Sequence, residues 1–193
     1  MIETEIRGRL TKESFNNLLA LFQKEGKLKD HYSRLSVDIS PGFDPKTRTW
    51  NNQAQTDLRL KKSGKSEKIS LKIGEYHLQE RKEIDVKLQE GEFIKAVDLF
   101  MSLGFDSGMI YFWESWEFEY QGFEIKLSKY TDEYYTWEIE TKEGEDPDVL
   151  ASQLSLIPYT KQEYKQAIDY ENQSIHQPFS LDVAEQLYGR FEK

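Results

Sequence analysis

Residues 3–9, which read ETEIRGR, carry charged side chains at every second position. Glu3, Glu5, Arg7 and Arg9 alternate there with small or apolar residues. In an extended strand, successive side chains point to opposite faces of the sheet. The stretch therefore predicts a strand that has one ionic face and one face suited to burial.

Seven later segments repeat this alternation, and each is predicted to be a strand. Their apolar positions fall on one face, as with Leu58 and Leu60 or Ile125 and Leu127, while ionic residues fall on the other. Ser63-Gly64 and Gln121-Gly122 are typical of tight hairpin turns, so the strands that they join should be antiparallel. The seven segments are 34–40, 56–62, 67–73, 81–88, 110–120, 123–129 and 135–141.

Helical spacing of apolar residues predicts five helices, one after the first strand, one between the fifth and sixth strands, and three at the end of the chain. Thr11 and Gly26 are a cap and a stop for the first helix, and Thr160 with Glu163 forms a capping box. The five helices lie within 11–26 and 92–104, at 146–154, from 160 onward, and at 180–191.

Length and composition restrict the class of protein. A chain of 193 residues fits a single domain, and 13% aromatic residues are enough to build its core. There is no cysteine, which excludes disulfides and thiolate metal sites. The net charge of −9 argues against a general nucleic-acid surface, and no apolar run is long enough to span a bilayer. We expect a cytoplasmic protein with neither a nucleic-acid nor a membrane partner.

Two arrangements satisfy strands with one apolar and one ionic face. The first is an open antiparallel sheet, with helices on its apolar face and water on the other. The second closes the eight strands into a barrel whose ionic face lines a wet tunnel. The many arginines on this face, among them Arg34, favour enclosed binding of an anion. We therefore predict an α+β fold, namely an eight-stranded antiparallel β-barrel with helices packed outside. The single domain spans 1–193, with the barrel at about 1–141 and a helical tail at about 146–193.

The order of the ionic motifs along the chain resembles the CYTH superfamily, also called the triphosphate tunnel metalloenzymes. The motifs are Glu-x-Glu in the first strand, "LRLKK", "ISLK" and "RKEID" in later strands, and "WEIE" in the last. The resemblance covers residues 1 to about 170. It implies an eight-stranded tunnel that binds a triphosphate-containing small molecule together with a divalent metal ion.

The resemblance also implies roles for individual residues. The expected metal ligands are carboxylates, which suit Mg²⁺ or Mn²⁺, and the expected phosphate-binding residues are basic. Arg7 and Glu83 are the expected catalytic residues, with Glu83 placed to orient a base or to reach a metal ion through water. The metal ligands are Glu3, Glu5, Glu138 and Glu140, and the phosphate-binding residues are Arg7, Arg9, Arg59, Lys61, Lys72, Arg81 and Lys126.

The favoured function is metal-dependent hydrolysis of inorganic triphosphate, thiamine triphosphate or a nucleoside triphosphate. Two departures from the family pattern keep alternatives open: Lys126 stands where an Asp ligand is usual, and residues 110–120 contain no basic residue. The alternatives are a non-catalytic module that binds phosphate or another polyanion, and an adenylate cyclase of class IV type.

Overall fold

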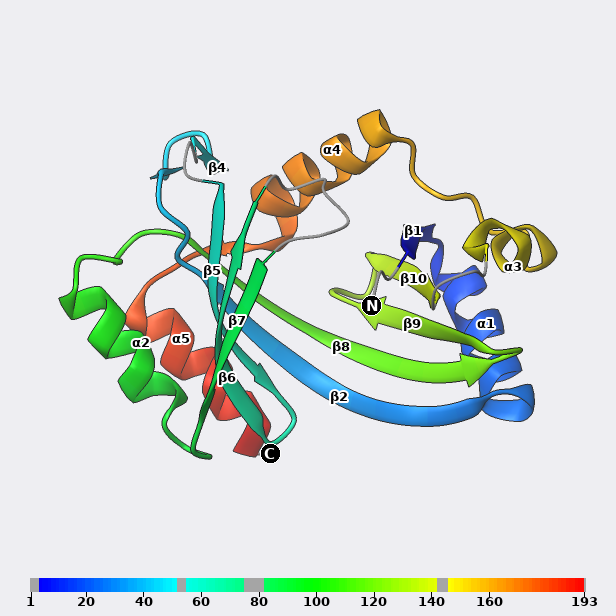
Figure 1. Cartoon of the computed structure of the whole chain (residues 1–193), viewed down its shortest axis with the longest axis horizontal. Helices are drawn as coiled ribbons and strands as arrows, with labels where there is room; N and C mark the ends of the chain where they lie inside the picture. The colour runs from blue at the N-terminus through cyan, green and yellow to red at the C-terminus, as the bar shows by residue number, and fades with distance from the viewer. Residues whose placement is uncertain (1–3, 52–54, 75–81, 142–145, 193) are drawn as a thin grey trace. The chain divides into compact units, whose positions relative to one another are not determined.

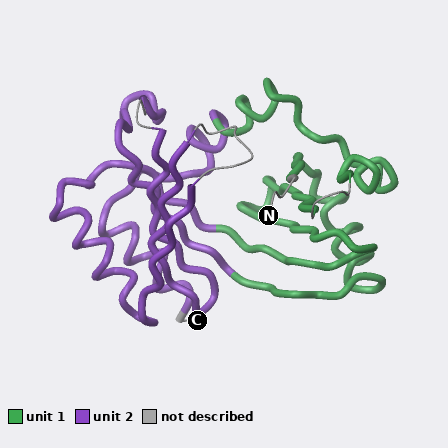
Figure 2. Tube along the Cα trace, viewed as in Figure 1, with its two compact units in different colours: residues 1–32, 113–168 green, residues 33–112, 169–193 purple. Residues whose placement is uncertain are grey.

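The computed structural model describes residues 4–51, 55–74, 82–141 and 146–192. The chain forms two compact units, and each unit is built from two separate segments (Figure 2). Unit 1 comprises residues 1–32 and 113–168, and unit 2 comprises residues 33–112 and 169–193. Each unit has its own buried core. The single domain over residues 1–193 stays a prediction.

The strands of unit 1 pair in the order β1-β10-β9-β8, and every neighbouring pair is antiparallel. Strand β8 starts in unit 2 and ends in unit 1, whereas β2 starts in unit 1 and ends in unit 2 (Figure 2). Three helices complete the unit. The elements are β1 (Thr4–Leu10), α1 (Lys12–Glu25), β2 (Lys27–Asp38), β8 (Met109–Tyr120), β9 (Phe123–Lys129), β10 (Tyr135–Thr141), α3 (Pro147–Gln153) and α4 (Lys161–Tyr170), the last two residues of which belong to unit 2.

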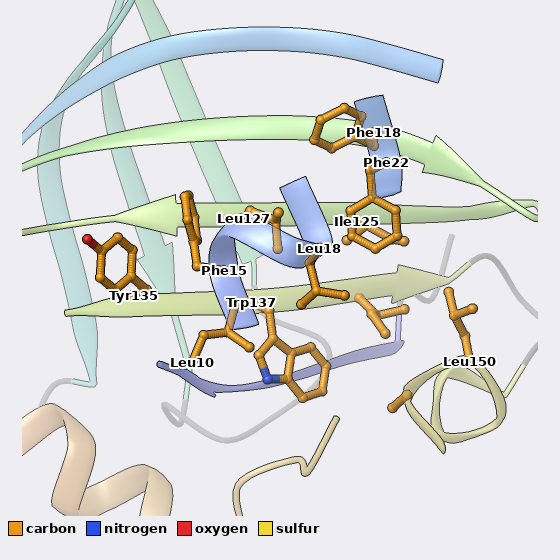
Figure 3. Close-up of a cluster of buried hydrophobic side chains, with 12 residues drawn as sticks. Leu10, Phe15, Leu18, Phe22, Phe118, Ile125, Leu127, Tyr135, Trp137 and Leu150 are labelled. Atoms are coloured by element: carbon orange, nitrogen blue, oxygen red, sulfur yellow. The ribbon is translucent and has the colours of Figure 1, made fainter. Parts of the chain in front are cut away.

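The core of unit 1 lies between helix α1 and the strands. Phe15, Leu18 and Phe22 share one side of α1 and point toward Leu127 of β9 and Trp137 of β10 (Figure 3). The helix begins where predicted, because the Thr11 hydroxyl accepts a hydrogen bond from the Ser14 amide. It ends at Gly26, as predicted. The apolar face of the strands is therefore covered by a helix in this unit.

Unit 2 contains a sheet in the order β2-β5-β6-β7, again antiparallel throughout. Helices α2 and α5 lie side by side (Figure 1). Their residues Phe93, Val97 and Leu187 pack with Leu35 and Leu60 of the sheet. The elements are β3 (Phe43–Asp44), β4 (Thr49–Trp50), β5 (Thr56–Ser63), β6 (Ser66–Ile73), β7 (Lys82–Leu88), α2 (Phe93–Ser102), a π-helix (Glu171–Ile175), β11 (Gln177–Pro178), α5 (Leu181–Tyr188) and a 3₁₀ turn (Gly189–Glu192).

Both predicted hairpins are present, and the first has its loop at Gly64-Lys65, one residue later than predicted, because Ser63 pairs with Ser66 in the ladder. Gly64 has φ 53°, and Gln121 and Gly122 have φ 54° and 90°. Positive φ at these loop positions matches the twist of antiparallel strands, which is why such turns join hairpins. The capping box of α4 is also confirmed, because the Thr160 amide donates to Glu163 and the Glu163 amide donates back to the Thr160 hydroxyl.

The structure differs from the sequence prediction in the length of β2 and in the cover over β7. Strand β2 begins at Lys27 rather than at residue 34, because its first residues are exposed on both faces and so carry no apolar alternation. On β7, Ile84 and Val86 are exposed by 41% and 52%, although they were expected under helices. The loop at 40–55 holds the short hairpin β3-β4.

The closed barrel is not confirmed. The described strands pair in the order β1-β10-β9-β8-β2-β5-β6-β7, which leaves an end at β1 and another at β7. A mixed α+β protein with a large antiparallel sheet is what the described residues show. Within these residues, no helix is long and apolar enough to cross a membrane.

Candidate functional site

The ionic face of unit 2 carries a row of basic side chains, here called the basic strip and consisting of Arg59 and Lys61 on β5 with Lys68 and Lys72 on β6. The two strands form a hairpin whose register places Lys61 opposite Lys68. Alternation along each strand puts the four side chains on one face. Leu58 and Leu60 point the other way, into the core that α2 and α5 cover. Burial of the apolar face thus orients the basic strip.

Arg59 is held by two carboxylates. Its Nε donates to Asp57 Oδ1 at 2.6 Å and lies 3.4 Å from Asp38 Oδ2. Asp38 is buried, and it also accepts hydrogen bonds from the Ser40 amide at 3.0 Å and the Tyr111 hydroxyl at 3.1 Å. Burial raises the pKa of Asp38, and the positive charge of Arg59 opposes that shift. The guanidinium is therefore fixed before any ligand arrives.

Lys61 is surrounded by other cations. Its Nζ donates to the Ser70 hydroxyl at 3.3 Å, and that hydroxyl donates to Glu83 at 3.2 Å. Burial, followed by the charges of Arg59 and Lys72, lowers the pKa of Lys61 to about 8. An anion that binds close to Lys61 would favour the charged form of this side chain.

The two lysines of the basic strip on β6 each pair with a carboxylate of β7. Lys72 Nζ lies 3.2 Å from Glu83 Oε2, and Lys68 binds Asp85. The predicted residues Arg59, Lys61, Lys72 and Glu83 are thus brought together in unit 2. Arg81 lies outside the described residues.

The ionic face of unit 1 contains three carboxylates, here called the acidic cluster: Glu5 on β1 with Glu138 and Glu140 on β10. Glu5 lies opposite Glu140 in the register, and Glu138 lies between Arg7 on one side and Lys126 on the other. The resemblance to the CYTH superfamily implied this grouping. Glu3, the fourth predicted metal ligand, lies outside the described residues.

Two basic side chains, Lys126 and Arg7, form ion pairs within the acidic cluster. Lys126 Nζ donates to Glu138 Oε2 at 2.7 Å, and the exposed fractions of the two side chains are 18% and 15%. Arg7 binds Glu5, lies 3.7 Å from Glu138, and donates to the Tyr164 hydroxyl at 3.2 Å. Although burial opposes these shifts, Glu138 raises the pKa values of Lys126 and Arg7, aided by Glu140 and Glu5 respectively.

The acidic cluster as described does not have the form of a metal site. In the part of the chain that the structure describes, no three His, Cys, Asp or Glu side chains converge in a way that could hold an ion. Glu138 already accepts a hydrogen bond from Lys126, and Glu5 already forms an ion pair with Arg7. Arg9, a predicted phosphate-binding residue, lies with its guanidinium 4.7 Å from the ring centre of Tyr134.

Sequence reasoning missed several residues that position these groups. Asp38 and Ser70 lie on the ionic face at positions of the same two-residue period, so the alternation could have identified them. Tyr111 and Tyr164 carry no such signal, because a tyrosine on a strand or helix is more often simply packed.

Comparisons with solved structures identify the fold. A protein of Pyrococcus horikoshii is 17% identical over 86% of this chain and 97% of that chain, with a TM-score of 0.59. A "putative adenylate cyclase" of Bacillus halodurans is 17% identical over 86% and 98%, with a TM-score of 0.52. Another from Vibrio parahaemolyticus is 13% identical over 93% and 95%, with a TM-score of 0.51.

The chain has the fold of these proteins. The fold that it shares with two proteins named as putative adenylate cyclases agrees with the resemblance drawn from its sequence. No protein-family model matches the sequence, and no curated protein does. At identities below one fifth, the likeness identifies the arrangement of the chain, and the function has to be argued from the site.

Proposed function

We propose that this protein binds the triphosphate group of a small molecule at the basic strip of unit 2 and hydrolyses it. The observation that carries the proposal is the environment of Lys61, which lies among three other cations and has a pKa of about 8. The four cations share one face, and although Arg59, Lys68 and Lys72 pair with carboxylates there, together they offer several N–H donors to the oxygens of a multiply charged anion. The shared fold with two proteins named as putative adenylate cyclases, which would act on a nucleoside triphosphate, supports this choice of anion.

The residues of the basic strip and Glu83 have different roles in the proposed reaction. Arg59, held by Asp57 and Asp38, turns its guanidinium to phosphate oxygens, and Lys61 and Lys72 supply further positive charge. Phosphoryl transfer depends mainly on positioning and on neutralising charge, which these cations provide. Glu83 orients the attacking water and accepts its proton while the anhydride bond to the leaving phosphate breaks. Hydrogen bonding to Ser70 keeps Glu83 beside Lys61.

Glu3, Glu5, Glu138 and Glu140 are the residues expected to hold Mg²⁺ or Mn²⁺, yet the three that are described bind or adjoin Arg7 and Lys126. These three do not fit a divalent ion as they stand, and no step of the proposed reaction is routed through one.

A phosphate-release assay tests the reaction. Tripolyphosphate, thiamine triphosphate and ATP are offered in turn, with Mg²⁺, with Mn²⁺ and with EDTA, and cyclic nucleotide is measured alongside phosphate. We expect phosphate from at least one substrate. Glu83→Gln should abolish release while calorimetry still shows tripolyphosphate binding. Release at the wild-type rate by Glu83→Gln would contradict the role assigned to this residue.

A charge-removal variant tests the site. Lys72→Gln should weaken tripolyphosphate binding by about tenfold or more, since a hydrogen bond to a charged group contributes about 1.5–3 kcal/mol. Lys95→Gln is the matched control, because Lys95 lies on the exposed side of α2, where it pairs with Glu92. Equal loss in both variants would show that the basic strip is not the binding site.

Binding without turnover is the second candidate function. It is favoured by Arg7, which stands at a position expected to be catalytic and cannot accept a proton because a guanidinium stays charged. Tight tripolyphosphate binding with no phosphate and no cyclic nucleotide would support it. Cyclic nucleotide from ATP would instead support the cyclase.

A further inference from the structure

Glu138 of the acidic cluster lies on the middle strand of three, with a cation on each neighbouring strand. Arg7 on β1 and Lys126 on β9 are both its register partners. Lys126 Nζ lies 2.7 Å from Glu138 Oε2, and Arg7 Nη2 lies 3.7 Å from Glu138 Oε1. Both carboxylate oxygens thus have a positive charge close by. Together the two cations carry the charge of one divalent ion.

A divalent ion at the same carboxylates would have to displace these side chains. Mg²⁺ binds oxygen at about 2.0–2.1 Å in near-octahedral geometry, which needs carboxylate oxygens that are accessible to it. The ammonium of Lys126 lies where such an ion would approach Glu138, and its side chain is only 18% exposed. Because the pair is largely buried, separating it leaves uncompensated charge, and the displaced cation would repel the incoming one.

We propose that Lys126 and Arg7 are built-in counter-ions of the acidic cluster, which take the place of a divalent cation. The protein therefore holds no Mg²⁺ or Mn²⁺ at this cluster, and it binds its anion without one. The statement about metal binding stands on the geometry of unit 1 alone. The statement about anion binding rests on the proposed function.

Direct titration with Mn²⁺ tests the first statement, with free Mn²⁺ followed by electron paramagnetic resonance. Lys126→Asp replaces the counter-ion by a carboxylate, and it should bind Mn²⁺ at least about tenfold more tightly than the wild type. Lys129→Asp is the matched control, because Lys129 lies on the same strand and pairs with Asp132 outside the cluster. The control should bind Mn²⁺ as weakly as the wild type.

Two results of the titration would overturn the proposal. One is a wild-type protein that binds Mn²⁺ as tightly as Lys126→Asp. The other is a folded Lys126→Asp, checked by circular dichroism, that gains no affinity over Lys129→Asp. If Lys126→Asp does not fold, Lys126→Gln decides in its place, since it removes the charge without adding another. A gain in Mn²⁺ affinity for Lys126→Gln supports the proposal, and no gain contradicts it.

Calorimetry of tripolyphosphate binding tests the second statement in EDTA and in Mg²⁺. We expect the same affinity in both. Binding that requires Mg²⁺ would overturn metal-independent binding and leave the proposed function intact. Absence of binding in both conditions would overturn the proposed function and metal-independent binding together, while the Mn²⁺ titration still decides whether Lys126 is a counter-ion.

Discussion

Single side chains in this protein act through the charges beside them. Arg59 is fixed by two aspartates, the charged form of Lys61 is destabilised by burial and by neighbouring cations, and the charged form of Lys126 is stabilised by Glu138. These three basic residues look alike in the sequence, and all were predicted to bind phosphate. Their surroundings separate their roles, because the free energy of a charge depends on burial and on its nearest partners.

The pKa of Lys61 predicts how binding changes with pH. As the pH rises through about 8, Lys61 loses its proton and stops attracting the anion. We expect wild-type affinity for tripolyphosphate, measured by calorimetry, to fall between pH 7 and pH 9. Lys61→Gln should bind more weakly at pH 7 and show a flatter profile, and it also controls for titration of the ligand. A profile as steep in this variant as in the wild type would assign the effect to another group.

Gly8 in β1 is required by the close approach of two other segments. A Cβ atom at this position would lie 2.6 Å from the Ile157 carbonyl oxygen and 2.6 Å from Nε1 of the buried Trp137. Gly8→Ala should therefore lower the free energy of unfolding by about 1–3 kcal/mol in urea titrations. Gly189→Ala is the control, because nothing lies within 4 Å of its added carbon. Equal stability of both variants would argue against the close approach.

At the scale of elements, a buried ion pair joins the β5-β6 hairpin to the helices of unit 2. Lys62 Nζ donates to Glu67 Oε1 at 2.9 Å on the face that is otherwise apolar. Glu67 also accepts hydrogen bonds from the Phe93 amide at the start of α2, at 2.8 Å, and from the Tyr188 hydroxyl of α5, at 2.9 Å. One carboxylate thus links the hairpin, α2 and α5.

Removal of this carboxylate should loosen unit 2. Breaking one partner of a buried pair costs about 3–5 kcal/mol, so Glu67→Ala should unfold at much lower urea concentration than the wild type. Glu90→Ala, at an exposed position, is the control and should change stability little. A wild-type unfolding midpoint for Glu67→Ala would show that the network does not stabilise the fold.

The same glutamate predicts a dependence of stability on pH. Although burial opposes the shift, hydrogen bonds from Lys62, Tyr188 and Gly91 lower the pKa of Glu67 below 4.5. Its contribution is present above that ordinary value and is lost as the pH falls through the lowered pKa. The stability difference between wild type and Glu67→Gln should therefore shrink on acidification below 4.5, as urea titrations at several pH values can measure.

At the scale of the whole molecule, neither unit is one continuous stretch of chain. Unit 2 needs residues 169–193, because Ala184 and Leu187 of α5 are buried in its core with exposed fractions of 0% and 2%. The end of the chain, predicted as a helical tail, is thus part of a core. Core positions contribute stability in proportion to the apolar surface that they remove from water.

Removal of residues 180–193 should consequently destabilise unit 2. We expect a lower melting temperature and stronger binding of the dye ANS, because the core facing α5 becomes exposed. Leu187→Ala should shift the melting temperature in the same direction by a smaller amount, since truncation of one buried leucine costs about 2–5 kcal/mol. An unchanged melting temperature after removal of the whole segment would contradict the place of α5 in the core.

The sequence by itself determined most of the elements, although not the first residues of β2 or the short strands β3, β4 and β11. Strict alternation located the strands, the Ser63-Gly64 and Gln121-Gly122 turns located hairpins, and caps such as Thr11 located helix ends, because these signals depend on local geometry. It also indicated the basic strip, since Arg59, Lys61 and Lys72 share a face once two strands are paired. The residue order also carried the resemblance with which the comparison of folds agrees.

Only the tertiary structure decided which charges meet. The two-residue period places Lys126 on an ionic face, but the register of three strands brings it to Glu138 together with Arg7. Likewise, the contacts of Tyr164 with Arg7 and of Tyr111 with Asp38 join residues far apart in the chain. Electrostatic interaction falls off with distance and depends on burial, neither of which a linear pattern contains.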